Sequence, residues 1–276
     1  MNLRQALTSA RETLATGNIE DPALESEILL RHVLAIDRAG LYSDLDRELN
    51  QRHEKNLSQI LERRRRGEPS AYITGHREFY GLDFTVNHDV LIPRPETELL
   101  VDLTIKLARD HKITKIADVG TGCGAIAVSL AKELPLATVY ATDISREALV
   151  IARQNCVRHG VSDRLVLLRG DLLEPLGKTV DMIAANLPYV KESDLPANGH
   201  EPAVALDGGK DGLDQIKRLC RQVGRKLRRD GYLLLEIGQG QAEMVVDILC
   251  KAFPAPAIEV HKDLAGIERV VSLRLT

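Results

Sequence analysis

The sequence has few aromatic residues and no long apolar run. Its 276 residues include no tryptophan, 3 phenylalanines and 6 tyrosines, so aromatic residues make up 3% of the chain. Stacking platforms for single-stranded nucleic acid are therefore scarce. The apolar runs all fall short of the roughly 20 residues that a membrane-spanning helix requires. We expect a soluble, cytoplasmic protein without a membrane segment.

Cysteines are also few, and they are widely separated. Cys123, Cys156, Cys220 and Cys250 lie tens of residues apart, and no two of them form a CxxC pair. This spacing predicts neither a zinc site nor a disulfide framework. We expect reduced thiols and no metal site.

Neither sign of charge dominates. The net charge is -3 and the isoelectric point is about 6.3. Residues 1–75 hold 11 Lys and Arg against 12 Asp and Glu, and the remaining residues hold 26 against 28. A protein that binds nucleic acid usually carries a basic domain. The even distribution disfavours RNA or DNA as a direct substrate.

The apolar pattern of the first 75 residues is helical. Apolar residues recur at helical spacing from Leu3 to Leu14, and a second helix is expected to begin at Pro22 with Asp21 as its N-cap. A third helical pattern covers residues 44–66. These patterns predict a small helical domain over residues 1–75.

The segment that follows has the pattern of a hairpin. Residues 79–86 read Phe-Tyr-Gly-Leu-Asp-Phe-Thr-Val, with a turn glycine and alternating apolar residues. We therefore predict a hairpin linker over residues 76–92 and a larger domain over residues 93–276.

Helical and strand-like segments alternate in the larger domain. Helices are expected at 95–110, 125–133 and 146–159, and strands at 116–119, 138–142, 165–168, 180–184, 232–237, 258–260 and 270–275. This order predicts an α/β fold: a mostly parallel seven-stranded sheet with helices on both faces, whose last strands form an antiparallel hairpin. Ligands of such sheets bind beyond the carboxyl ends of the strands.

A glycine-rich turn follows the first expected strand. Asp118 precedes Gly120-Thr121-Gly122-Cys123-Gly124, whose glycines let the backbone approach a ligand. Asp143 ends the next strand, where a carboxylate can accept hydrogen bonds from ribose hydroxyls. The GxGxG spacing and the pair Asp171-Leu172, suited to an adenine, favour S-adenosylmethionine over a dinucleotide. A dehydrogenase that uses NAD and a nucleotide fold that has lost its activity remain alternatives.

The tetrapeptide Asn186-Leu187-Pro188-Tyr189 directly follows the strand expected at 180–184. It resembles the (Asn/Asp/Ser)-x-Pro-(Tyr/Phe) motif of methyltransferases that modify planar NH2 groups. Such a nitrogen is a poor nucleophile, so an enzyme must hold it in line with the methyl group and polarise its hydrogens. The Asn186 side-chain oxygen and the Leu187 carbonyl can accept those two hydrogens, and Tyr189 can pack on the planar group.

Three flanking segments extend this resemblance over nearly the whole chain. They are 65–69 (Arg-Arg-Gly-Glu-Pro), 72–79 (Tyr-Ile-Thr-Gly-His-Arg-Glu-Phe) and 91–98 (Leu-Ile-Pro-Arg-Pro-Glu-Thr-Glu), and 200–213 fits the same pattern. Together they resemble the protein-glutamine N5-methyltransferases of peptide chain release factors.

The resemblance implies the fold of class I S-adenosylmethionine-dependent methyltransferases. It also implies that the methyl acceptor is the glutamine of the Gly-Gly-Gln motif in class I release factors. It implies that S-adenosylmethionine lies over Gly120 to Gly124, Asp143, Asp171, Leu172 and Asn186. Arg94 and Glu201 would join residues 186–189 in binding the substrate. The helical domain would grip the release factor, and the enzyme would act as a monomer.

Leu187 is the one departure from the family motif, which usually reads Asn-Pro-Pro-Tyr. Asn-Leu-Pro-Tyr instead resembles ribosomal RNA adenine dimethyltransferases, so an adenine N6-methyltransferase acting on RNA or DNA is the alternative function. The expected contact is a backbone carbonyl, which leucine supplies as well as proline. We therefore expect the amide chemistry to be retained with a less rigid loop.

Overall fold

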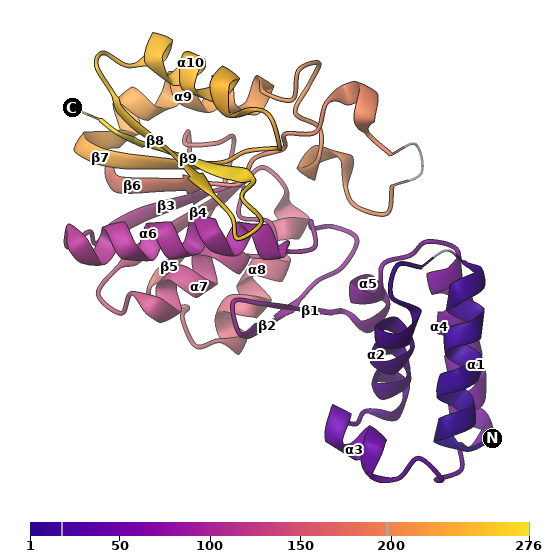
Figure 1. Cartoon of the computed structure of the whole chain (residues 1–276). Coiled ribbons are helices and arrows are strands. Elements are labelled where there is room, and N and C mark those ends of the chain that lie inside the picture. Colours follow the sequence, from indigo (N-terminus) through magenta and orange to yellow (C-terminus); the bar gives the residue numbers. More distant parts are fainter. Residues whose placement is uncertain (18, 197–198, 276) are drawn as a thin grey trace. The chain divides into compact units, whose positions relative to one another are not determined.

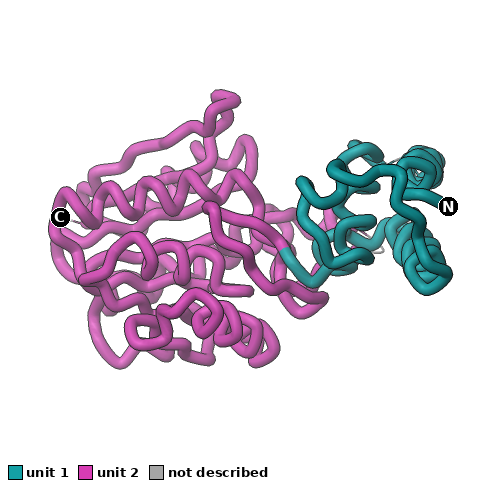
Figure 2. Tube along the Cα trace, turned by 90° about the horizontal axis from the view of Figure 1, so that it is seen from below, with its two compact units in different colours: residues 1–76 teal, residues 77–276 magenta. Residues whose placement is uncertain are grey.

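The computed structural model describes residues 1–17, 19–196 and 199–275. The chain divides into two compact units, Met1–His76 and Arg77–Thr276 (Figure 2). Each unit has a hydrophobic cluster of its own.

The first unit is helical (Figure 1). Its helices are α1 (Leu3–Thr16), α2 (Pro22–Leu34), α3 (Arg38–Ser43), α4 (Gln51–Arg65) and α5 (Ser70–Thr74). Asn2, Asp21, Asp37 and Asn50 cap the first four of them with their side chains. Buried leucines on these helices, including Leu3, Leu14, Leu29 and Leu30, form its core.

The start predicted for the third helical pattern is wrong. The helix begins at Gln51, and residues 44–50 are not helical. The carbonyl groups of Leu45 and Arg47 accept hydrogen bonds from the backbone of Arg4 and Leu3, which ties this segment to the start of α1. Apolar spacing alone does not reveal that these carbonyls are already used.

The arginine run at the end of α4 is paired with acidic residues. Arg63 contacts Glu68, Arg64 contacts Glu25, and both Arg65 and Arg66 contact Glu62. All four guanidinium groups are therefore ion-paired and form no free basic patch.

The hairpin consists of β1 (His76–Phe79) and β2 (Leu82–Thr85). Its two turn residues, Tyr80 and Gly81, have positive φ angles of 53° and 68°, as a two-residue hairpin turn requires. The buried ring of Phe84 packs on His159. All of the segment 76–92 after His76 belongs to the second unit.

The second unit is built on a seven-stranded sheet with the order β5-β4-β3-β6-β7-β9-β8. Its strands are β3 (Lys115–Val119), β4 (Thr138–Asp143), β5 (Leu165–Arg169), β6 (Val180–Ala185), β7 (Leu227–Glu236), β8 (Ala257–Lys262) and β9 (Glu268–Arg274). Strands β3, β4, β5, β6 and β7 pair in parallel with one another, and β9 pairs antiparallel with both β7 and β8. The predicted sheet, with its terminal antiparallel hairpin, is confirmed.

Helices cover both faces of the sheet. Helices α6 (Glu98–Asp110), α7 (Ala125–Glu133) and α8 (Arg146–Arg158) lie on one face, and α9 (Asp214–Lys226) and α10 (Ala242–Ala252) on the other (Figure 1). Short 3-10 turns are η1 (Pro95–Thr97), η2 (Glu192–Asp194) and η3 (Ala203–Ala205). Helices α9 and α10 were not among the helices expected from the sequence, although both carry buried apolar residues on one side.

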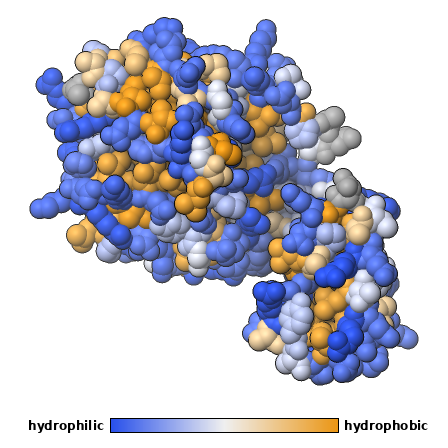
Figure 3. Space-filling model, viewed as in Figure 1, coloured by the Kyte–Doolittle hydropathy of each residue, from blue (hydrophilic) through white to orange (hydrophobic). Residues whose placement is uncertain are grey.

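The surface mixes hydrophilic and hydrophobic residues on the face shown in Figure 3. In the described part of the chain, no helix is both long and apolar enough to cross a membrane.

Asn155 on α8 connects the hairpin to the glycine-rich turn. It is fully buried, and its side chain bonds the backbone N–H of Thr85 at 2.8 Å, the carbonyl of Thr85 at 3.0 Å and the carbonyl of Cys123 at 2.8 Å. One side chain therefore satisfies three backbone groups of segments that are far apart in sequence.

We expect Asn155→Ala to lower the free energy of unfolding by about 2 to 4 kcal/mol, because it leaves buried backbone groups without partners. Urea unfolding of the full chain measures this loss. Gln154→Ala, on the exposed side of the same helix, is the control and should change little. An equal effect of the two substitutions would contradict the assigned role.

Candidate active site

The glycine-rich turn after β3 is folded against the end of β4. The N–H groups of Gly120 and Thr121 donate to the carbonyl of Thr142 at 2.9 and 3.0 Å. Gly120 has a φ of 75°, and a Cβ there would lie 3.3 Å from the Leu187 side chain. Glycine at this position thus lets the turn approach the segment that follows β6.

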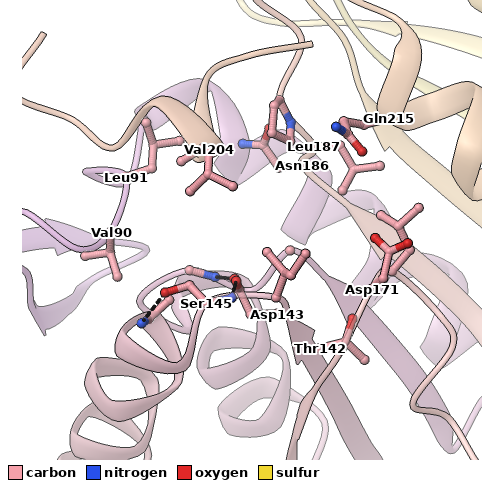
Figure 4. A pocket seen from close by; sticks show the side chains of 18 of the residues that line it. Val90, Leu91, Thr142, Asp143, Ser145, Asp171, Asn186, Leu187, Val204 and Gln215 are labelled. Atoms are coloured by element: carbon pink, nitrogen blue, oxygen red, sulfur yellow. Dashed lines mark hydrogen bonds between the residues drawn. The ribbon is translucent and has the colours of Figure 1, made fainter. Parts of the chain in front are cut away.

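Asp143 is held by backbone donors at the end of β4. Its two carboxylate oxygens accept from the N–H groups of Gly122 and Ser145, at 2.8 and 2.9 Å. Burial raises its pKa, and these backbone bonds oppose the rise. The carboxylate retains lone pairs that face the cavity beside it (Figure 4).

Asp118 lies beneath the same turn and is fully buried. One carboxylate oxygen accepts from the Thr121 hydroxyl at 2.6 Å and from the Ala127 N–H at 3.1 Å. Its other oxygen has no partner among the described residues. Burial raises the pKa of Asp118 to about 7, against the effect of its two hydrogen bonds.

Two cavities adjoin at the carboxyl edge of the sheet. The one with more lining residues, named the larger cavity for that reason, is lined by the turns after β3, β4 and β5, including Gly120, Gly122, Asp143, Asp171 and Leu172. The smaller one is lined by residues that include Arg94, Tyr189 and Leu206. Both share Leu91, Asn186, Leu187, Pro188 and Ala205. The tetrapeptide therefore lies where the two cavities meet.

The residues around the larger cavity face one another across it. Asp143 and Ser145 lie on one side, with Leu91, Val204 and Asn186 opposite (Figure 4). Asp171 is paired with Arg218 of α9, which sequence reasoning did not foresee. The hydroxyl of Thr142, also in the lining, is buried and has no partner among the described residues.

Asn186 is oriented by a residue of η1. Its side-chain nitrogen donates to the Thr97 hydroxyl at 3.1 Å, so its oxygen is not used in that bond. Tyr189 is held at two points. Its carbonyl accepts from the Gln241 side chain at 3.1 Å, and its hydroxyl lies 3.4 Å from the Glu236 carboxylate. A Cβ at Gly212 would overlap that same carbonyl oxygen of Tyr189.

Arg94 and Glu201 form an ion pair, and Glu201 also accepts from the Ile92 N–H at 3.0 Å. Arg94 lines the smaller cavity, whereas Glu201 lines neither cavity. Glu201 thus fixes the loop that carries Leu91 and Arg94.

Comparison with known proteins identifies the family. Residues 5–75 match the family model of the PrmC N-terminal domain, and residues 96–201 match that of the methyltransferase small domain. A curated release factor glutamine methyltransferase of Moorella thermoacetica is 43% identical over 274 residues, which are 98% of this chain and 97% of the relative. The chain belongs to the release factor glutamine methyltransferase family.

A second family member, the release factor glutamine methyltransferase of Koribacter versatilis, is 42% identical over 98% of each chain. Among solved structures, a ribosomal protein L11 methylase of Lactobacillus delbrueckii subsp. bulgaricus has a TM-score of 0.52 at 23% identity, over 69% of this chain and 84% of the other. A methyltransferase of Pyrococcus furiosus has a TM-score of 0.54 at 17% identity, over 71% and 90%. The class I methyltransferase fold predicted from the sequence is confirmed.

Cys123 is the one member of the glycine-rich turn with a titratable side chain. It is buried, and burial raises the pKa of its thiol to about 12. A thiol with this pKa is not a nucleophile at neutral pH. Within residues 1–17, 19–196 and 199–275, no three His, Cys, Asp or Glu side chains are grouped to hold a metal ion.

The sequence analysis assigned no role to Thr97, which lies in the quoted segment 91–98. It did not single out four other residues around the site, which are Asn155, Arg218, Glu236 and Gln241. Glu236, the last residue of β7, could have been noticed because a carboxylate at the end of a buried strand is unusual. The partner of Asp171 lies 47 residues further along the chain, and nothing local marks it.

The buried Asp118 makes stability depend on pH. Its folded pKa of about 7 exceeds the model value of 3.8, so the stability it contributes is present below about pH 4 and is lost as the pH rises toward 7. Asp118→Asn removes this titration. We expect the free energy of unfolding of the variant, relative to the wild type, to rise by about 1 to 3 kcal/mol between pH 5 and pH 8.

Thermal or urea unfolding at the two pH values measures that difference. Asp110→Asn, at an exposed position, should show no such change. A constant difference between Asp118→Asn and the wild type at both pH values would show that Asp118 does not titrate in this range.

Proposed function

We propose that this protein transfers a methyl group from S-adenosylmethionine to the side-chain amide nitrogen of the glutamine in the Gly-Gly-Gln motif of class I release factors. The observation that carries the proposal is the position of Asn186-Leu187-Pro188-Tyr189 at the junction of the two cavities. The name shared by its relatives, release factor glutamine methyltransferase, supports the acceptor.

The larger cavity fits S-adenosylmethionine. Asp143 offers carboxylate lone pairs for ribose hydroxyls, and the glycine-rich turn admits a ligand where a Cβ would be crowded. Leu172 presents an apolar side chain for the adenine ring, and Asp171, although paired with Arg218, retains lone pairs for an adenine amino group. The cofactor supplies a methyl group on a sulfonium, which is a good leaving group.

The smaller cavity fits the acceptor amide. The Asn186 oxygen and the Leu187 carbonyl are two acceptors for the two N–H groups of the glutamine side chain. Tyr189 provides a planar ring beside them, and its pKa, raised by burial to about 12, keeps it neutral. Hydrogen bonds to both N–H groups increase electron density on the nitrogen and hold its lone pair toward the methyl group.

The reaction is a direct displacement. With the cofactor bound, the nitrogen–methyl bond would form as the sulfur–methyl bond breaks, S-adenosylhomocysteine would leave, and the proton would pass from the nitrogen to water during or after the transfer. No strong base is required before attack. Proximity and orientation therefore account for most of the rate enhancement.

Leu187 supports the same chemistry. Its side chain is 4% exposed and belongs to the core of the second unit. Burial fixes the segment without the ring of a proline, so the carbonyl acceptor is kept in place.

We extend the proposal to the rest of the chain: the helical unit, residues 1–75, contributes to recognition of the release factor, and the enzyme acts as a monomer in the cytoplasm. Against the adenine alternative stand the near-neutral charge of both parts of the chain and the ion pairing of the arginine run.

Incubation with radiolabelled S-adenosylmethionine should label a purified class I release factor on the glutamine of its Gly-Gly-Gln motif. Asn186→Ala should reduce that labelling by at least about 100-fold, because one of the two amide acceptors is lost, while binding of S-adenosylhomocysteine is retained. Gln154→Ala is the control. Labelling of ribosomal RNA or DNA in place of the release factor would refute the proposal.

A further inference from the structure

Glu236 is a buried acid whose position is not explained by the sheet. It ends β7, is 2% exposed, and points its carboxylate toward the tetrapeptide side of the sheet edge, where Oε1 accepts from the Tyr189 hydroxyl. Its other oxygen, Oε2, is buried and has no partner of ordinary hydrogen-bond length in the described residues. Burying a carboxylate costs free energy, so this residue requires an explanation.

Thr97 is its second neighbour. Thr97 is 4% exposed, and side-chain hydrogen bonding by its hydroxyl lowers the pKa of Glu236. The Thr97 oxygen already accepts the Asn186 side-chain nitrogen at 3.1 Å. Its own proton is therefore free to be donated, and Oε2 of Glu236 has room to accept it.

The direction of these hydrogen bonds determines which way the Asn186 amide faces. An ionised carboxylate only accepts hydrogen bonds, so Thr97 can interact with Glu236 only as the donor, and its oxygen accepts from the NH2 group of Asn186. The oxygen of Asn186 is then left for the acceptor. We propose that Glu236 is a positioning residue for methyl transfer, which acts through Thr97 to hold the Asn186 oxygen toward the substrate amide. This inference rests on the function proposed above.

Protonation of Glu236 would reverse the pattern. The carboxylic acid would donate a proton to Thr97 or Tyr189, and Thr97 could then donate to the Asn186 oxygen, which would no longer be available to the substrate. Burial raises the pKa of Glu236 to about 7. The groups that act on this pKa are Thr97 and Tyr189, which lower it by hydrogen bonding, Glu96 on η1, which raises it, and Arg269 on β9, which lowers it.

The test uses the full chain with the labelling assay at pH 6 to 9. In the wild type, kcat should fall below about pH 7 as Glu236 becomes protonated. Glu236→Gln should lower kcat by roughly 10- to 100-fold, since a charge-assisted hydrogen bond is lost, and should abolish this fall. Binding of S-adenosylhomocysteine should be unchanged. Glu243→Gln, at an exposed position on α10, is the matched control.

Two substitutions of Thr97 distinguish a positioning role of Glu236 from a merely structural one. Thr97→Ser keeps the hydroxyl and should retain the wild-type pH profile. Thr97→Val keeps the shape and should resemble Glu236→Gln, and the double variant should be little worse than either single variant because both act on one chain of hydrogen bonds. Wild-type kcat and pH profile in Glu236→Gln, or equal loss in Thr97→Ser and Thr97→Val, would overturn the proposal.

A measurement without turnover distinguishes this inference from the proposed function. The side-chain amide resonance of Asn186, assigned by its absence in Asn186→Ala, should shift with pH near 7 in the wild type and not in Glu236→Gln. If the wild type labels no release factor, the proposed function fails, and this titration still decides the role of Glu236. The same pH response in both proteins would refute that role.

Discussion

The site depends on the parallel hydrogen bonding of β3 to β4 on one side and to β6 on the other. Asp118 is in register with Ala141 of β4 and with Ala184 of β6. The turns after these three strands therefore open at one edge of the sheet, within reach of one another. That register brings the cofactor turn of β3, the carboxylate of β4 and the tetrapeptide of β6 around one space, although they lie almost 70 residues apart in sequence.

Polar groups beneath this edge are held by a small number of buried side chains. Asn155 satisfies the backbone of two separate segments, and Gln241 holds both the Gly238 N–H and the carbonyl of Tyr189. A buried polar group is stable only when it is paired, so each of these contacts fixes a loop in one conformation. Loops that must align two substrates gain their rigidity in this way.

The sequence predicted the parts of the structure that have a local signal. The strand ending at Val119, the glycine-rich turn and Asp143 were identifiable because their residue types follow from backbone geometry and strand alternation. The family assignment and fold were predicted correctly from spaced motifs. The contacts of those motifs were not predictable: the pairing of Asp171 with Arg218, or of Asn186 with Thr97, joins segments whose proximity exists only after folding. The segment before α4 shows the same limit, since backbone bonds from Leu45 and Arg47 to the start of α1 keep it out of the helix.

The hairpin has a practical consequence for dividing the chain. It was predicted as a linker between two domains, yet Asn155 bonds the backbone of Thr85 and the carbonyl of Cys123 together, and the buried Phe84 rests on His159. A recombinant fragment that starts at residue 93 would lack β1 and β2. The side chains of Asn155 and His159 would then lose their contacts with Thr85 and Phe84. The smallest autonomous fragment of that unit therefore has to include the hairpin, and proteolytic trimming that stops before His76 should leave it intact.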